Sequence, residues 1–137
     1  TCDRELRYTW IANPHRDVTE ADLIGRRDDE IPNVGATPAE VAALMDLKRQ
    51  VVESGQGARR DLRWTGRDGA ANFYDVAVEP LRDPASGAVI GATVATLDIT
   101  ARVRAMEALQ EQEVRQRLLI NELNHRVKNT LASVQSI

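Results

Sequence analysis

The C-terminal part of the chain holds one histidine whose neighbours could support nucleophilic or proton-transfer chemistry. Glu122 precedes His125 by three residues and Asn129 follows it by four, so on a helix all three share one side. Glu122 could accept an imidazole N–H, fix the tautomer and act as a base, and Asn129 could donate a hydrogen bond. Arg126 and Lys128 could attract an anionic group. The alternative is that His125 is one more polar residue on a solvated helix face.

The segment around His125 is amphipathic, and the imidazole projects from its polar side. Apolar positions recur at helical spacing and form one face almost opposite His125. They are Ile120, Leu123, Val127, Thr130, Leu131 and Val134. An imidazole that has to meet a second molecule must point away from the packed face of its helix, so this pattern suits a reactive histidine.

This segment resembles the phosphoacceptor box of the HWE family of histidine kinases, through Glu122-Leu-Asn-His-Arg-Val-Lys-Asn-Thr-Leu131. The resemblance implies that His125 is phosphorylated, with Glu122 as a candidate base and Lys128 and Asn129 as further site residues. It also implies a parent enzyme that uses ATP and Mg²⁺. That enzyme would pass the phosphoryl group from His125 to an aspartate of a response-regulator receiver domain.

The chain from Ala101 to Ile137 contains neither glycine nor proline and is rich in strong helix formers, so we expect one long helix. Residues 101–117 would form a helical signalling linker, and residues 118–137 the start of the dimerisation and phosphoacceptor helix. In the linker, polar residues interrupt any heptad. This favours a coiled coil with a weakly specified register. A solvated helix is the alternative.

The first hundred residues predict an α+β fold, with an antiparallel sheet and helices on one face. Alternating aromatics indicate a strand over Leu6–Ala12. Thr37-Pro-Ala-Glu40 is a capping box that should begin a helix, which Gly55 should end. Its buried stripe comprises Val41, Leu44, Leu47, Lys48, Val51 and Val52. Three strands should follow over about 60–65, 72–80 and 89–97, joined by turns at Arg67-Asp-Gly69 and Asp83–Gly87.

This order of elements is similar to that of PAS sensor domains over residues 1–100. The likeness is carried by the segments 3–13 and Leu23-Ile-Gly25 and by Asp98-Ile-Thr100, which closes the last strand. The resemblance also requires a strand before the Asp3-Arg4-Glu5 turn, of which Thr1 and Cys2 remain.

The PAS resemblance implies a cavity for a small molecule. We expect it to be lined by Trp10, Leu47, Val51, Tyr74, Val76 and Val94. The alternative is that these six are ordinary core residues. Asp98 and Thr100 are residue types that cap helices, so we expect them to couple the sensor domain to the helix.

Several classes of site and partner are disfavoured by the composition. The single cysteine excludes a disulfide framework and a multi-cysteine metal site. The flavin motif Asn-Cys-Arg-Phe is missing, and residues 38–54 hold no histidine for haem. His15 fits a solvated loop residue better than a metal ligand. A net charge of -3 gives no sign of nucleic-acid binding.

These observations predict the sensory and phosphoacceptor part of a two-component sensor histidine kinase. We expect a cytoplasmic homodimer that lacks the ATP-binding domain and is not catalytic alone. The alternative is a non-catalytic PAS module for dimerisation or scaffolding.

Overall fold

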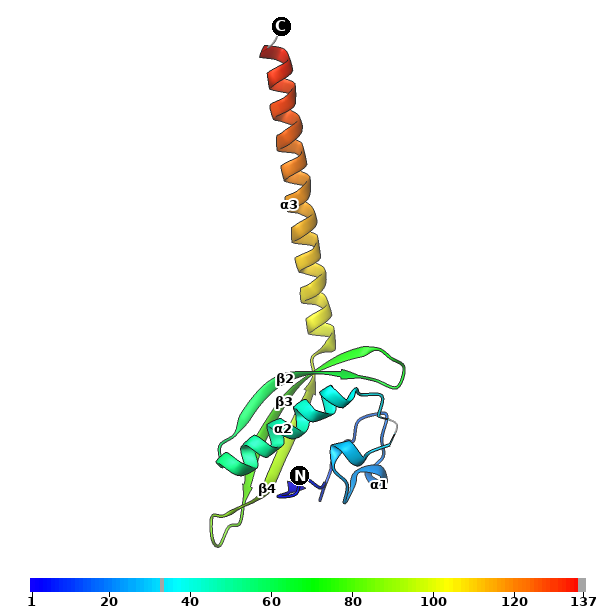
Figure 1. The fold of residues 1–137 in the computed structure, drawn as a ribbon, viewed down its shortest axis with the longest axis vertical. Coiled ribbons are helices and arrows are strands. Elements are labelled where there is room, and N and C mark those ends of the chain that lie inside the picture. The colour runs from blue at the N-terminus through cyan, green and yellow to red at the C-terminus, as the bar shows by residue number, and fades with distance from the viewer. Residues whose placement is uncertain (33, 136–137) are drawn as a thin grey trace. The chain divides into compact units, whose positions relative to one another are not determined.

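The computed structural model describes residues 1–32 and 34–135, and its contacts divide the chain into Thr1–Thr100 and a unit from Ala101 onward. The described part of the first unit contains an antiparallel sheet in the order β1 (Cys2–Asp3), β4 (Val89–Asp98), β3 (Ala71–Arg82) and β2 (Ala58–Thr65). The helical elements are α1 (Glu20–Leu23), the 3₁₀ helix η1 (Asp28–Glu30) and α2 (Pro38–Ser54). α2 packs against β2, β3 and β4 (Figure 1). The expected α+β class is confirmed.

Helix α2 begins and ends where the sequence predicts. The Thr37 hydroxyl accepts the Glu40 N–H at 3.2 Å, and the Glu40 carboxylate accepts the Thr37 N–H at 3.0 Å. Gly55 ends the helix with φ of 68°, a left-handed conformation that glycine adopts without steric cost. Between these caps, one face of the helix joins the core. The buried apolar side chains of that face are Val41, Met45, Leu47, Val51 and Val52.

The three long strands form an antiparallel meander, as predicted. Both connections occur at the expected turns, and each strand is slightly longer than its sequence pattern indicated. Tyr74 of β3 pairs with Leu62 of β2 and with Asp98 of β4. β4 lies between β3 and β1, but β1 reaches only Gly91 and Ala92 of it.

The strand predicted over Leu6–Ala12 is wrong. β1 is the short strand before the Asp3-Arg4-Glu5 turn, and the following segment makes only isolated bridges through Tyr8, to Cys2 and to Ile24. Leu6 and Asn13 have φ of 65° and 50°, which interrupt an extended strand at both ends. The alternation of aromatics has another cause. Tyr8 points into a buried polar cluster and Trp10 lines a cavity.

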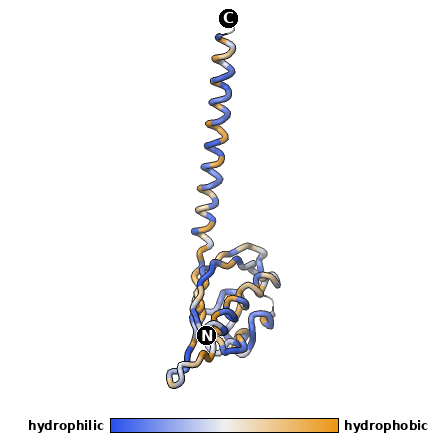
Figure 2. Tube along the Cα trace, turned by 60° about the vertical axis from the view of Figure 1, so that its left-hand side comes forward, coloured by the Kyte–Doolittle hydropathy of each residue, from blue (hydrophilic) through white to orange (hydrophobic). Residues whose placement is uncertain are grey.

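Helix α3 (Thr100–Gln135) begins at the last residue of the first unit and forms the described part of the second. The single long helix expected from the sequence is confirmed for its described residues. The last two residues of the predicted segment lie outside them. None of the described side chains of α3 is buried. Along the helix, hydrophobic residues lie between longer hydrophilic stretches (Figure 2).

Candidate functional site

His125 is exposed on α3 and contacts Asn129, one turn further along. The side-chain amide nitrogen of Asn129 lies 3.2 Å from the Nδ1 atom of His125. This contact follows from the four-residue spacing, which brings side chains together on one side of a helix. An amide can present either its N–H₂ or its oxygen to the ring, so Asn129 can favour either imidazole tautomer.

The other charged neighbours predicted for the site are arranged differently. The Glu122 carboxylate accepts from the Arg126 guanidinium at 2.7 Å, so Arg126, and not His125, is its partner here. Both side chains are more than half exposed, so this ion pair breaks at little cost. Lys128 is also exposed on α3.

The apolar face predicted opposite His125 is exposed along α3. Each of its large side chains has more than half of its surface accessible to solvent. They are Leu119, Ile120, Leu123, Val127, Leu131 and Val134. Nothing within α3 itself can cover this face, because a single helix cannot fold back on its own side chains.

The first unit contains a partly open cavity of about 300 Å³ between the sheet and the N-terminal segments. Four of the six residues expected to line it do so: Trp10, Tyr74, Val76 and Val94. Leu47 and Val51 do not. They are 1% and 0% exposed and belong to the packed core beneath α2.

The interpretation of His15 as a solvated loop residue is wrong, because the half-buried side chain lines this cavity and contacts Tyr74 of the sheet. Its Nε2 atom lies 2.7 Å from the Tyr74 hydroxyl, and the two rings meet edge to face. The backbone N–H of Asp17, which can only donate, contacts Nδ1 of His15 at 3.3 Å. A neutral His15 therefore carries its proton on Nε2 and donates to Tyr74. Burial, with a smaller effect of Asp98, raises the pKa of Tyr74, which stays protonated.

A second cluster at the cavity was also missed, and it is almost fully buried. Lys48 Nζ donates to Asp28 at 2.6 Å and to the Tyr8 hydroxyl at 2.8 Å, and Tyr8 donates to Asp28 at 2.7 Å. The Lys48 and Asp28 side chains are 0% and 3% exposed. Burial and the Asp28 carboxylate raise the pKa of Tyr8 well above its ordinary value. Tyr8 and Asp28 line the cavity.

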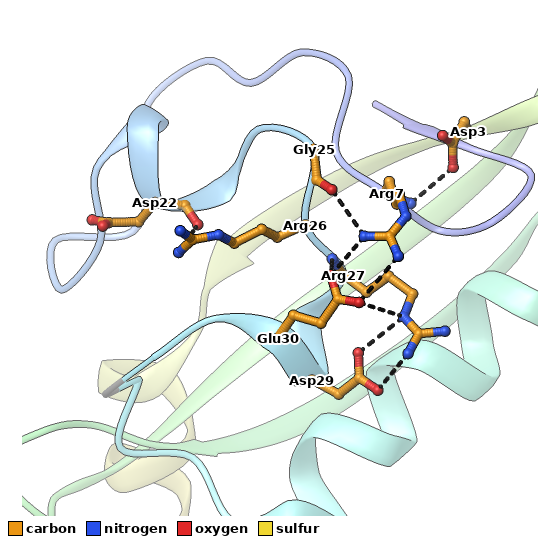
Figure 3. A network of polar contacts seen from close by, with 8 residues as sticks. All are labelled: Asp3, Arg7, Asp22, Gly25, Arg26, Arg27, Asp29 and Glu30. Atoms are coloured by element: carbon orange, nitrogen blue, oxygen red, sulfur yellow. Dashed lines mark hydrogen bonds and ion pairs between the residues drawn. The ribbon is translucent and has the colours of Figure 1, made fainter.

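Surface ion pairs hold the segment that carries Asp28. Arg7 donates to both carboxylate oxygens of Glu30, at 2.6 and 3.1 Å, and to the Gly25 carbonyl at 2.9 Å. Arg27 binds the Asp29 carboxylate, and its backbone N–H donates to Glu30 (Figure 3). These contacts fix η1 against the turn after β1, and so position Asp28.

The residues at the end of β4 are joined to β3. Asp98 accepts from the backbone N–H of Thr100 at 2.9 Å and from its hydroxyl at 2.5 Å. The Thr100 hydroxyl oxygen accepts the Phe73 N–H at 3.0 Å, and buried Ile99 donates its N–H to the Phe73 carbonyl at 2.9 Å. The hydrogen bonds from Thr100 lower the pKa of Asp98.

Comparison with known proteins identifies both parts of the chain. The family model described as the PAS fold matches residues 1–104. The chain belongs to the PAS fold family. A second family model, described as HWE histidine kinase, matches residues 122–137, around His125. The PAS domain is therefore followed by a segment of an HWE histidine kinase, as the two resemblances implied.

The similar proteins include histidine kinases. Histidine kinase 5 of Arabidopsis thaliana is 28% identical over 141 residues, 98% of this chain and 15% of that protein. Probable histidine kinase 1 of Oryza sativa subsp. indica is 28% identical over 144 residues, 96% of this chain and 14% of that protein. The chain thus spans about 15% of the length of these relatives.

A solved structure supports the fold of the PAS domain. The VqmA dimer of Vibrio cholerae, determined without its target DNA, aligns with a TM-score of 0.51 at 28% identity. The alignment covers 60% of this chain and 35% of that chain.

Two further observations concern the described residues. No group of three or more His, Cys, Asp or Glu side chains is placed there to hold a metal ion. The helices in that part of the chain include none that is long and apolar enough to cross a membrane.

Proposed function

We propose that this chain is the sensory and phosphoacceptor portion of a two-component histidine kinase. In this proposal the PAS domain controls ATP-dependent phosphorylation of His125, and the phosphoryl group then passes to a receiver-domain aspartate. The match to HWE histidine kinases around His125 is the observation that carries the proposal. The exposure of His125 on α3 supports it, because the imidazole must reach two other partners in turn.

The contact between Asn129 and His125 suggests how the imidazole is prepared. In the structure the amide nitrogen of Asn129 faces Nδ1; when the amide turns over and its oxygen faces Nδ1 instead, the ring keeps its proton there and the Nε2 lone pair is free. Nε2 then attacks the γ-phosphorus of ATP, the bond to the leaving ADP oxygen breaks, and the ring becomes cationic. A base then removes the Nδ1 proton. Glu122 remains a candidate for that role, since its exposed pair with Arg126 is easily opened.

Lys128 and Arg126 would stabilise negative charge on the phosphoryl group and would not transfer protons. A phosphoryl group on His125 carries negative charge on three strongly accepting oxygens. Cationic side chains on the same helix attract that group and screen the product. Neither residue needs to change its protonation state for this.

The Asp98–Thr100 segment supports control by the PAS domain. Tyr74 lines the cavity, and its neighbour Phe73 makes the backbone contacts that hold Ile99 and Thr100. A change in the cavity that shifts Tyr74 therefore also shifts its neighbour Phe73. Phe73 is hydrogen-bonded to Thr100, the first residue of α3. We infer that the Asp98–Thr100 segment, through its contacts with Phe73, transmits the signal toward His125.

The test is phosphorylation of the full-length protein with labelled ATP, comparing wild type with His125→Gln. We expect an acid-labile, base-stable label that is lost in the variant. His15→Gln, at the other histidine, is the control for the labelled site: it should still carry the label, whatever its effect on the rate through Tyr74. Label that persists at full level in a folded His125→Gln variant would refute the assignment.

A further inference from the structure

The wall chemistry of the PAS cavity restricts the kind of molecule that it can take. Four aromatic side chains line it: Tyr8, Trp10, Trp64 and Tyr74. Most of the remaining wall is aliphatic. Flat aromatic faces pack best against another planar group. The volume of about 300 Å³ lies at the lower end of small-molecule sites, so the occupant is small.

The charge inside the cavity is nearly balanced. Among the described lining residues, Asp17 and Asp28 carry carboxylates and no lysine or arginine side chain is present, while the Thr1 ammonium already donates to the Trp10 carbonyl at 2.6 Å. Asp28 is already matched by buried Lys48, and Asp17 lies 3.6 Å from the His15 ring. An anion would meet two carboxylates. A cation at Asp28 would have to sit beside the Lys48 ammonium. Either ion would lose part of its hydration at a wall whose charged groups, Thr1, Asp17 and Asp28, already have partners.

The polar groups that remain can bind a neutral molecule. Asp28 accepts one bond from Tyr8 and one from Lys48, which leaves lone pairs on a carboxylate at the cavity wall. Tyr74 receives the His15 N–H, so its own hydroxyl proton is available to a further acceptor. The cavity therefore offers an acceptor at Asp28 and a donor at Tyr74, within a wall that is mainly aromatic and aliphatic.

We propose that the PAS cavity binds a small, planar, uncharged molecule that carries both a hydrogen-bond donor and an acceptor, such as an aromatic amide or a hydroxylated nitrogen heterocycle. Its N–H or O–H donates to Asp28, and its acceptor receives the Tyr74 hydroxyl. This inference deepens the proposed function, since such a molecule would be the signal. It also accounts for His15, which orients the Tyr74 hydroxyl.

The test uses three probes of nearly the same shape on the 137-residue chain: benzamide, benzoate and benzamidinium. Isothermal titration should show that benzamide binds at millimolar concentration or better, and that the two ions bind at least about tenfold more weakly. Cyclohexanecarboxamide, which keeps the amide but is not flat, should also bind more weakly. Equal or tighter binding of either ion or of the non-planar amide, or no binding of benzamide, overturns the proposal.

Two variants then locate the binding site. Tyr74→Phe keeps the ring and removes the donor, and should weaken benzamide binding about fivefold. Leu97→Ala changes an exposed side chain of β4 that does not line the cavity, and should bind benzamide as wild type does. An unchanged affinity of Tyr74→Phe for benzamide would show that the Tyr74 hydroxyl is not the donor. Titration measures benzamide binding and needs no kinase activity. If benzamide does not bind, the assignment of His125 as the phosphorylated residue is unaffected. If His125 is not phosphorylated, the binding result still stands.

Discussion

The backbone N–H of Phe73 donates to the hydroxyl oxygen of Thr100 at 3.0 Å. Phe73 therefore holds the first residue of α3, while the next residue on β3, Tyr74, has its side chain at the cavity. Neighbouring residues of a strand point to opposite faces of a sheet. One peptide bond thus separates a cavity-lining side chain from the anchor of the helix.

Thr100→Val tests this anchor, because it keeps the shape of the side chain and removes the hydroxyl. The Phe73 N–H and the Asp98 carboxylate both lose a partner, so we expect the free energy of unfolding to fall by about 1–3 kcal/mol in urea denaturation. In the full-length kinase, His125 labelling should persist but respond weakly to a cavity ligand. Thr100→Ser keeps the hydroxyl and is the control. A Thr100→Val protein with wild-type stability and response would show that Thr100 does not couple the PAS domain to α3.

The Asp98 cap has a defined pH dependence. Hydrogen bonds from Thr100 lower the pKa of Asp98 below its ordinary value of 3.8. A carboxylate with a lowered folded pKa adds stability that is present above the unfolded pKa and is lost as pH falls through the folded value. The difference in unfolding free energy between wild type and Asp98→Asn should therefore be constant from neutral pH to about pH 5 and shrink below pH 4. A difference that does not shrink below pH 4 would contradict this cap.

Local sequence signals predicted the fold well. The capping box at Thr37, the glycine at the end of α2 and the two turns of the meander each depend on residues close in the chain, and all are confirmed. The Leu6–Ala12 strand was wrong because its alternating aromatics face a buried cluster and a cavity, and its backbone pairs only through Tyr8.

The polar part of the cavity could not be predicted, because its partners are distant in sequence. Lys48 fitted the buried stripe of α2 by position, but its partner Asp28 lies twenty residues away on η1. His15 meets Tyr74 across fifty-nine residues, and no periodicity connects a loop with a strand. The predicted lining failed at Leu47 and Val51, since helical spacing gives the buried face but not which part of it is packed and which borders a void.

The buried pair of Lys48 and Asp28 should be costly to break. Lys48→Met leaves the Asp28 carboxylate buried without its cation, so unfolding free energy should fall by about 3–5 kcal/mol. Arg49→Met is the matched control. Its ion pair with Asp46 is exposed, so its loss should cost less than about 1 kcal/mol. Adding Asp28→Asn to Lys48→Met should restore part of the loss. Equal effects of the Lys48 and Arg49 variants would show that burial does not govern this pair.

Asn129 should tune His125 without being essential. Asn129→Ala removes one hydrogen bond to the imidazole, so we expect His125 labelling in the full-length kinase to slow about fivefold. The ¹⁵N chemical shifts of the ring in the 137-residue chain should report a changed tautomer ratio. Asn124→Ala is the control, because neighbouring helical residues point about 100° apart. A wild-type rate and tautomer ratio in Asn129→Ala would exclude this role.

The apolar face of α3 should be the contact between two copies of the chain. Its six large side chains are exposed, and burying one Leu, Ile or Val is worth about 1.5–3 kcal/mol, so an aqueous surface is an unfavourable place for all of them. Leu123 lies within this face, whereas Leu118, at about 100° per residue, lies on the side of His125. Both are exposed leucines of one helix, so Leu123→Glu and Leu118→Glu form a matched pair. We expect wild type and Leu118→Glu to sediment as dimers at micromolar concentration, and Leu123→Glu to dissociate at least about tenfold more readily. A monomeric wild type, or two variants that dissociate equally, would show that this face does not hold the dimer.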